Sequence, residues 1–188
     1  MDERRKVAHC GATEVWVWRG DITAADTEAI VNAANNEGWL GSGVAGAIRR
    51  AAGDQVEDEA VAQAPWPVGD AVRTGPGRLG ERGVKAILHA AAMAPGRPAS
   101  AEAVGTATAA ALRLAAAEGL TSVALPALGT GVGGVGLEAA AAAMGAAVRD
   151  HAAGPTPVTT VVFVLYDQAA LDRFGGALER ALEGDLGR

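Results

Sequence analysis

One glycine-rich run constrains this chain more than any other stretch. Residues 129–136 read Gly-Thr-Gly-Val-Gly-Gly-Val-Gly, after an aliphatic run at 121–128 and before an alanine-rich stretch at 137–148. This order predicts a strand, a loop and a helix. Because glycine has no side chain, the backbone N–H groups of such a loop can close on phosphate oxygens, and the helix N-terminus adds unpaired N–H groups. The run therefore predicts an anion site, although a tight turn between a strand and a helix would use the same glycines.

A second glycine-rich segment, residues 41–46, also opens a predicted helix and favours the anion site over the plain turn. The run at 129–136 is not closed by the Lys-Ser or Lys-Thr pair of a Walker P-loop. Any phosphate would therefore be held by backbone groups and helix ends.

Strands and helices alternate along the chain. Strands are expected at 13–18, 28–35, 70–74, 85–91, 121–127 and 159–166. Helices are expected at 43–52, 54–64, 100–118, 137–151 and 168–182. The strands are continuous apolar runs, which predicts an α/β fold, a three-layer α/β/α sandwich around a mixed, mostly parallel sheet. Ligands bind such sheets beyond the carboxyl ends of the strands.

The composition bounds the domain organisation and the partners. A chain of 188 residues with 49% hydrophobic residues predicts one globular domain, here residues 13–188, after a flexible leader at residues 1–12. The net charge of −6 and the absence of a basic cluster argue against a nucleic-acid binder. The single cysteine, Cys10, excludes an internal disulfide and is not favoured as a nucleophile. With no apolar leader, no membrane-length run and no metal-ligand spacing, we expect a cytoplasmic protein without membrane partner, metal or cofactor.

Polar side chains lie at or just beyond the ends of several predicted strands. Asn32 and Asn35 end one strand, and Tyr166 and Asp167 end another, so together with the glycine run at 129–136 they can share one crevice. An asparagine amide suits sugar hydroxyls, but Asn32 and Asn35 could equally make Asx-turns, and Asp21 could be a turn residue beside a helical turn that Thr23 caps. His89 lies within an apolar run, where a hydrogen-bonded core histidine is favoured over a catalytic base.

Five motifs resemble those of macrodomains in their order and spacing. They are Gly20-Asp21-Ile22-Thr23, Val31-Asn32-Ala33-Ala34-Asn35, Gly41-Ser42-Gly43-Val44-Ala45-Gly46-Ala47-Ile48, Leu125-Pro126-Ala127-Leu128-Gly129-Thr130-Gly131 and Leu165-Tyr166-Asp167. The resemblance spans residues 13–182. It implies that the chain binds ADP-ribose, free or attached to proteins and metabolites, and that nucleic acid is a partner only if it is ADP-ribosylated.

The resemblance assigns a part of the ligand to each motif. It implies that the Asp21 carboxylate accepts a hydrogen bond from the adenine amino group, while Tyr166 packs against the ring and Asn35 contacts the distal ribose. Backbone of the two glycine segments is implied to hold the diphosphate. The implied ligand-binding residues are Asp21, Ile22, Ala33, Asn35, Gly43, Val44, Ala45, Leu128, Gly129, Thr130, Gly131, Val132, Gly133 and Tyr166.

Two functions stay open within this resemblance. Macrodomain hydrolases of the MacroD type carry an aspartate that positions or activates water, and this chain has Ala45 at that position. Family members with the same Gly-Val-Ala sequence are described as hydrolases, so one possibility is cleavage of an ADP-ribosyl or O-acetyl-ADP-ribose bond. The bound diphosphate would then polarise the water, with Asn35 and Gly43 as candidate catalytic residues. The alternative is a non-catalytic ADP-ribose reader. Lys85, in a buried strand, and Lys6 are poorly suited as nucleophiles.

A third class, a dinucleotide-binding oxidoreductase, would need Gly-x-Gly-x-x-Gly at the first strand–helix turn, which Gly20-Asp21-Ile22-Thr23 does not supply. Trp39, with Asn36 and Glu37, lies between the asparagine motif and the second glycine segment. We hypothesise that Trp39 lies near the mouth of the distal-ribose end and influences which attached group fits. The alternative is an exposed or packing tryptophan without such a role.

Overall fold

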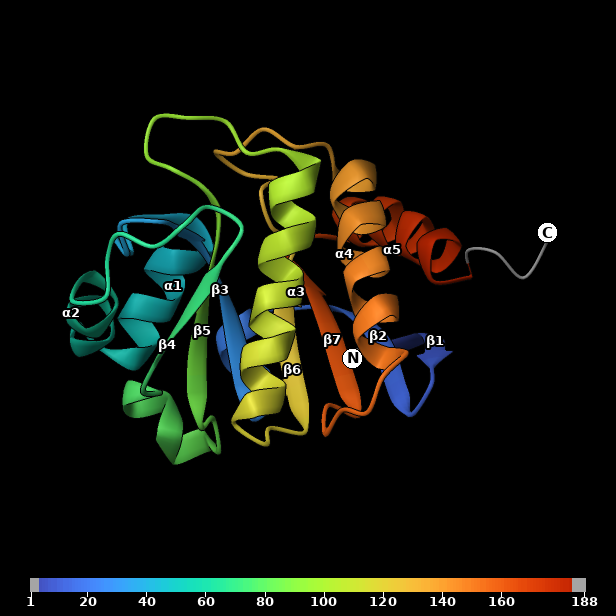
Figure 1. Cartoon of the computed structure of the whole chain (residues 1–188), viewed down its shortest axis with the longest axis horizontal. Coiled ribbons are helices and arrows are strands. Elements are labelled where there is room, and N and C mark those ends of the chain that lie inside the picture. Colours follow the sequence, from blue (N-terminus) through green and yellow to red (C-terminus); the bar gives the residue numbers. More distant parts are fainter. Residues whose placement is uncertain (1–3, 184–188) are drawn as a thin grey trace.

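Seven strands form the central sheet of the computed structural model, which describes residues 4–183 (Figure 1). They are β1 (Arg5–Cys10), β2 (Thr13–Arg19), β3 (Ala29–Asn35), β4 (Ala71–Thr74), β5 (Ala86–Met93), β6 (Ser122–Pro126) and β7 (Thr160–Leu165). Their order across the sheet is β1-β2-β7-β6-β3-β5-β4. The inner strands pair in parallel, and β1 and β4 pair antiparallel at the two edges. The expected mixed, mostly parallel sheet is confirmed.

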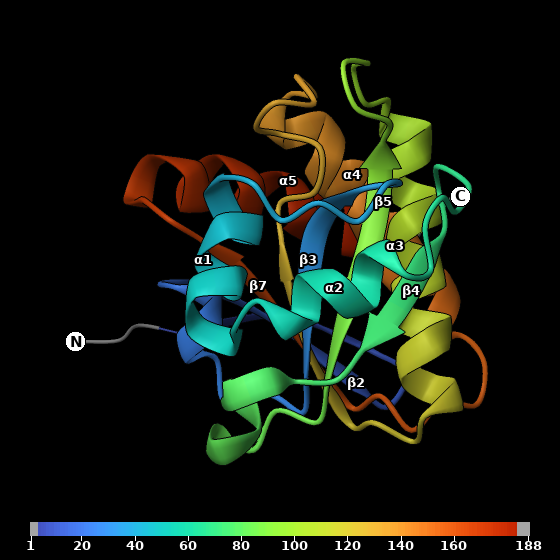
Figure 2. The same cartoon turned by 90° about the vertical axis from the view of Figure 1, so that its left-hand side faces the viewer.

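Helices cover both faces of this sheet. They are α1 (Gly43–Ala52), α2 (Gln55–Val61), α3 (Ala101–Ala117), α4 (Leu137–Ala152) and α5 (Gln168–Glu183), with the 3-10 helices η1 (Ile22–Ala24) and η2 (Gly77–Arg82). One core lies between the sheet and α3, α4 and α5, and a second lies between the sheet and α1, α2, η1 and η2 (Figure 2). Successive residues of one strand enter different cores, which explains the continuous apolar runs. The α/β/α sandwich is thus confirmed.

The flexible leader expected over residues 1–12 is wrong for residues 5–10, which form the edge strand β1. It pairs antiparallel with β2, and Lys6 Nζ lies 2.7 Å from Glu14 Oε1 and 5.0 Å from the Trp16 ring centroid. A charged sequence is typical of an edge strand, where it prevents pairing with another chain, and this is why the pattern looked like a leader. Residues 1–3 of the expected leader lie outside the described residues.

The turn after β2 also differs from expectation. Asp21, not Thr23, is the N-cap of η1, and its Oδ1 accepts hydrogen bonds from Thr23 N at 2.9 Å and Thr23 Oγ1 at 2.8 Å. The capping box expected from Thr23 and Asp26 does not form, because Thr23 lies within η1 and Asp26 lies beyond its end, where it pairs with Arg4 at 2.5 Å. Asp21 therefore holds the turn with one carboxylate oxygen. No helix within residues 4–183 combines the length and the apolar character needed to cross a membrane.

Candidate functional site

A cleft of about 380 Å³ lies at the carboxyl ends of the parallel strands. The strand residues that line it come from the ends of β3, β5, β6 and β7, and both glycine-rich segments and the first turns of α4 and α5 complete it. Its lining consists of Ala33, Ala34, Ser42, Gly43, Val44, Ala45, Ala90, Ala92, Met93, Pro126, Ala127, Leu128, Gly129, Thr130, Gly131, Val132, Gly133, Leu137, Val164, Leu165, Tyr166 and Ala170. The cleft is at the edge where a parallel sheet is expected to bind ligands.

The N-terminus of α1 opens into this cleft. The first helical hydrogen bond runs from Gly46 N to Ser42 O at 3.1 Å, so the N–H groups of the preceding turn have no acceptor within residues 4–183. Gly43 adopts a φ of +58°, and a Cβ at that position would meet nothing within 4 Å. The Ser42 side chain makes no capping bond to the helix. Free N–H groups at a helix N-terminus favour an anion.

The second glycine segment, between β6 and α4, folds back on itself. Val135 N donates to Gly129 O at 2.9 Å, Gly134 N donates to Gly131 O at 3.1 Å, and Ala99 N holds Gly133 O at 2.9 Å. These bonds use the carbonyl groups of the loop. The N–H groups of residues 131–133 find no acceptor among residues 4–183, and these three residues line the cleft.

The glycines of this loop serve different purposes. At Gly129, where φ is +73°, a Cβ would lie 2.6 Å from Val104 Cγ2, so packing and backbone conformation both require glycine. At Gly133 a Cβ would lie 2.7 Å from Gly129 O. At Gly131, which lines the cleft, a Cβ would meet nothing within 4 Å. A side chain is therefore excluded by close contacts at Gly129 and Gly133, whereas Gly131 has space around it.

Asp21 and Tyr166 approach one end of the cleft from neighbouring strands. Gly20 N donates to Leu165 O at 2.9 Å, which places the residues after β2 and β7 side by side. The Tyr166 side chain is 90% exposed and lines the cleft, so its ring is available to a ligand. Asp21 uses Oδ1 for η1, and its other oxygen has no partner within residues 4–183. Ile22 is buried in the core beneath α1.

Asn35 lies at the end of β3 and organises the loop that follows. Its Nδ2 donates to Trp39 O at 3.2 Å, and its Oδ1 accepts from Glu37 N at 2.9 Å. This is the Asx-turn role, and one N–H and one lone pair of the amide remain for a ligand. Asn35, Asp21 and Ile22 are the expected ligand-binding residues that do not line the cleft.

Asn32 and His89 form a buried network below the cleft. The Asn32 Nδ2 lies 3.1 Å from His89 Nδ1, and Thr74 Oγ1 lies 2.9 Å from His89 Nε2. Thr74 Oγ1 also donates to Gly75 O at 3.1 Å, so it accepts from His89 Nε2–H, and Nδ1 accepts from Asn32. Burial lowers the pKa of His89 to about 4 and keeps the ring neutral. The expected core histidine is confirmed, and Asn32 is a structural residue.

The lining of the cleft carries no Asp, Glu, His, Lys, Arg or Cys side chain among residues 4–183. Ala45, at the position discussed for a catalytic aspartate, is 7% exposed. Within the same residues no group of three or more His, Cys, Asp or Glu side chains could hold a metal ion.

Several lining residues were missed by the sequence reasoning. Ala90, Ala92 and Met93 form the floor contributed by β5, and Leu137 and Ala170 begin the helices α4 and α5. They are small or apolar residues without chemical signature, so only their place at the ends of strands and the starts of helices could have identified them.

Comparison with known proteins identifies a family and several relatives. A family model described as Macro domain matches residues 31–144. An uncharacterized protein of Aquifex aeolicus is 44% identical over 160 residues, which are 85% of this chain and 94% of that protein. The O-acetyl-ADP-ribose deacetylase of Escherichia coli is 37% identical over 162 residues, 83% of this chain and 90% of that protein. An uncharacterized protein of Mycobacterium tuberculosis is 42% identical over 166 residues. The match covers 88% of this chain but only 45% of that protein.

Solved structures show the same fold. A mutant macrodomain of Oceanobacillus iheyensis with ADPR has a TM-score of 0.83 at 25% sequence identity, and the match covers 96% of this chain and 100% of that chain. The two chains therefore share the sheet and the helical layers on both its faces.

Proposed function

The chain belongs to the macrodomain family, and we propose that its cleft binds ADP-ribose, either free or as a modification of a protein or metabolite. The observation that carries this proposal is that the α1 N-terminus and the loop at 129–133 both present free N–H groups to one cleft. Such groups suit a diphosphate, because they stabilise negative charge without a basic side chain. The ADPR in the Oceanobacillus iheyensis structure contains a diphosphate of this kind.

The two ends of the cleft suit the two ends of ADP-ribose. The end beside Asp21 and Tyr166 offers a carboxylate oxygen and an exposed ring, which suit an amino group and the face of adenine. The opposite end, near Ala33 and Met93, lies next to Asn35 and suits the distal ribose. The diphosphate then lies over Gly43 and Gly131, where the backbone leaves space for it.

We further propose that the cleft hydrolyses the bond between C1″ of the distal ribose and its attached group, or an O-acetyl ester of that ribose. In the first reaction water adds to C1″, the bond to the attached group breaks, and that group leaves with the electron pair. Because the lining has no carboxylate or histidine among residues 4–183, a diphosphate oxygen of the substrate holds and polarises the water, whose proton passes to the departing group or to solvent. Asn35 and Gly43 position the ribose. The deacetylase name of the Escherichia coli relative supports this proposal.

A non-catalytic reader is the second candidate, and the same uncharged lining favours it. Backbone N–H groups and apolar contacts are sufficient to bind ADP-ribose, and Ala45 supplies no base. Binding and hydrolysis must therefore be measured separately.

Calorimetric titration with ADP-ribose tests binding, and incubation with ADP-ribosylated protein tests release. Tight binding with release that Asn35→Ala slows would support the hydrolase, because Asn35 holds the loop beside the ribose. The rate of release should vary little between about pH 7 and about pH 9. The diphosphate oxygens that hold the water stay ionised over that whole range. Tight binding without release from several linkages would support the reader. A lack of binding would refute both.

A further inference from the structure

The loop between β3 and α1 is fixed by hydrogen bonds that use its backbone. Asn36 N donates to Met93 O at 3.1 Å and ties the loop to the end of β5. The Asn35 side chain accepts a hydrogen bond from Glu37 N at 2.9 Å and donates one to Trp39 O at 3.2 Å. The side chains of Glu37 and Trp39 take no part in these bonds. The loop therefore keeps its shape independently of the two side chains that it carries.

The far end of the loop is anchored to α2. Leu40 is fully buried, and its N–H donates to Glu57 Oε2 at 2.6 Å. Arg49 of α1 lies 3.1 Å from the other oxygen of the same carboxylate. At Gly38, where φ is +80°, a Cβ would lie 2.9 Å from the Ala60 carbonyl carbon, so the loop backbone rests directly on α2. Between its two anchors the loop is thus rigidly supported.

Two side chains on this loop are left without partners. The Trp39 side chain is 54% exposed although its backbone is anchored. Glu37 is half-buried, and within residues 4–183 its carboxylate makes no hydrogen bond or ion pair. By contrast, the carboxylate of Glu57 on the neighbouring helix α2 forms an ion pair with Arg49. The loop thus carries an exposed indole two residues from an unpaired carboxylate, and each of these groups suits a cation.

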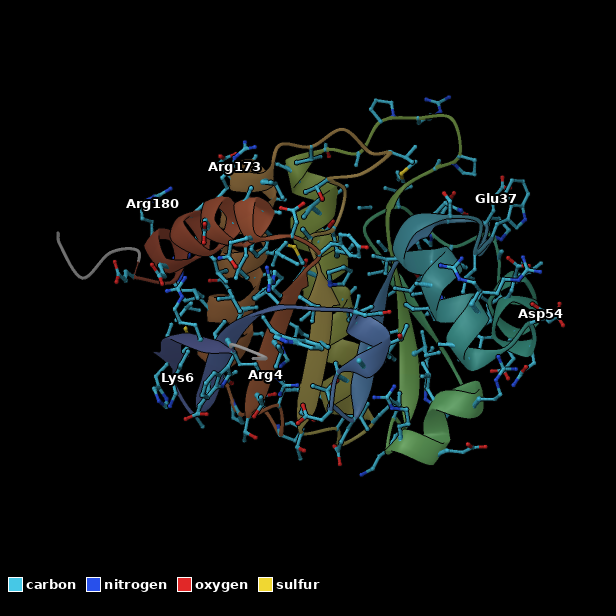
Figure 3. All side chains as sticks on the ribbon, turned by 180° about the vertical axis from the view of Figure 1, so that it is seen from behind. Arg4, Lys6, Glu37, Asp54, Arg173 and Arg180 are labelled. Atoms are coloured by element: carbon cyan, nitrogen blue, oxygen red, sulfur yellow. The ribbon has the colours of Figure 1, made fainter. Side chains whose placement is uncertain are left out.

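The loop lies at the mouth of the distal-ribose end. Its bond to Met93 joins it to a residue of the cleft lining, and Ser42, which follows the loop, also lines the cleft. In Figure 3, Glu37 lies on the same side of the molecule as the loop that follows β5. A group attached to C1″ would leave the cleft past this loop.

We propose that Glu37 and Trp39 form a carrier-recognition surface that selects ADP-ribosyl groups attached to basic peptides. The guanidinium of an arginine near the modified residue stacks on Trp39 and pairs with Glu37. This inference rests on the proposed binding of ADP-ribose. It assigns the choice of substrate to side chains outside the cleft. Among residues 4–183, no charged side chain lines the cleft itself, so the lining cannot distinguish carriers by charge.

The test compares affinities for free ADP-ribose and for two non-hydrolysable ADP-ribosylated peptides, one with arginines beside the modified residue and one with glycines. We expect the arginine peptide to bind about ten-fold more tightly than the glycine peptide. The double variant Glu37→Gln, Trp39→Ala should remove this preference and leave the affinity for free ADP-ribose within about two-fold, because the loop is held by backbone bonds. Glu81→Gln, an equal charge change on exposed η2, is the matched control and should keep the preference.

Several outcomes would overturn the inference while ADP-ribose binding stands. Equal affinity for both peptides would remove the carrier-recognition surface. A preference that survives in the double variant would assign it to other residues, and loss of the preference in Glu81→Gln would assign it to net charge. A lack of binding to free ADP-ribose is a different result, because it would refute the proposed function itself.

Discussion

Acidification should destabilise the fold through one buried side chain, His89. The ring is fully buried, and burial lowers its pKa from 6.5 to about 4. In the unfolded chain the ring titrates near its ordinary pKa. Between these two values the unfolded chain binds more protons than the folded chain, so the free energy of unfolding falls as the pH falls. From about pH 7 to about pH 5 this linkage removes about 2 kcal/mol, and the effect ends below about pH 4, where both states are protonated.

Urea unfolding at a series of pH values measures this loss, and His89→Gln provides the comparison. A glutamine amide can accept from Asn32 Nδ2 and donate to Thr74 Oγ1, but it does not titrate. The variant should therefore lose less stability than the wild type between about pH 7 and about pH 5, by about 2 kcal/mol. His151, whose pKa burial and Arg113 also lower, is present in both proteins and cancels in the difference.

Parallel stability curves for the two proteins would refute this reasoning. They would mean that His89 is protonated in the folded protein as readily as in the unfolded chain. The neutral ring, with Nε2–H donated to Thr74, would then be the wrong assignment.

Three substitutions separate the fold from the binding site. Gly131→Glu should leave the melting temperature unchanged, since a Cβ there meets nothing within 4 Å, but should weaken ADP-ribose binding by about 100-fold through steric overlap and repulsion of the diphosphate. Gly129→Ala should lower the melting temperature, because φ is +73° and Val104 Cγ2 lies 2.6 Å from the new Cβ. Asp21→Ala should weaken ADP-ribose binding by about 1–3 kcal/mol and should also cost about 1 kcal/mol of stability, because η1 loses its cap. Calorimetry and thermal denaturation of each variant check these outcomes, and unchanged binding in Gly131→Glu would remove the loop from the site.

The sequence predicts the parts of this structure that depend on local pattern. Continuous apolar strands and glycine segments before helices are local signals, so the sandwich and the cleft edge follow from them. The edge strand β1 was missed because its charged residues are what an exposed edge requires, and composition alone cannot distinguish that from a loose segment. Both Asp21 and Thr23 are cap-forming residues, and only the structure shows that η1 begins at Ile22, which makes Asp21 its cap.

Other features of the site depend on packing between distant segments. Gly129 and Gly131 are equivalent in the sequence, but Val104 of α3 crowds only the first. Likewise, the sequence offers many charged residues near the motifs, and only the fold shows that none of those among residues 4–183 lines the cleft. The sequence alone therefore could not show which glycine is crowded or that the cleft lining is uncharged.

The uncharged lining of the cleft also predicts how ADP-ribose affinity depends on salt concentration. The chain has a net charge of −6, and no Lys or Arg among residues 4–183 lines the cleft, so the long-range field repels an anionic ligand. Attraction comes from N–H groups in direct contact, which salt screens least. Raising the salt concentration from about 0.01 M to about 0.15 M should therefore leave ADP-ribose affinity unchanged or raise it slightly. Calorimetry across that range checks the sign. An affinity that falls steeply with salt would mean that a basic side chain contacts the diphosphate, and backbone recognition would then be the wrong account of the site.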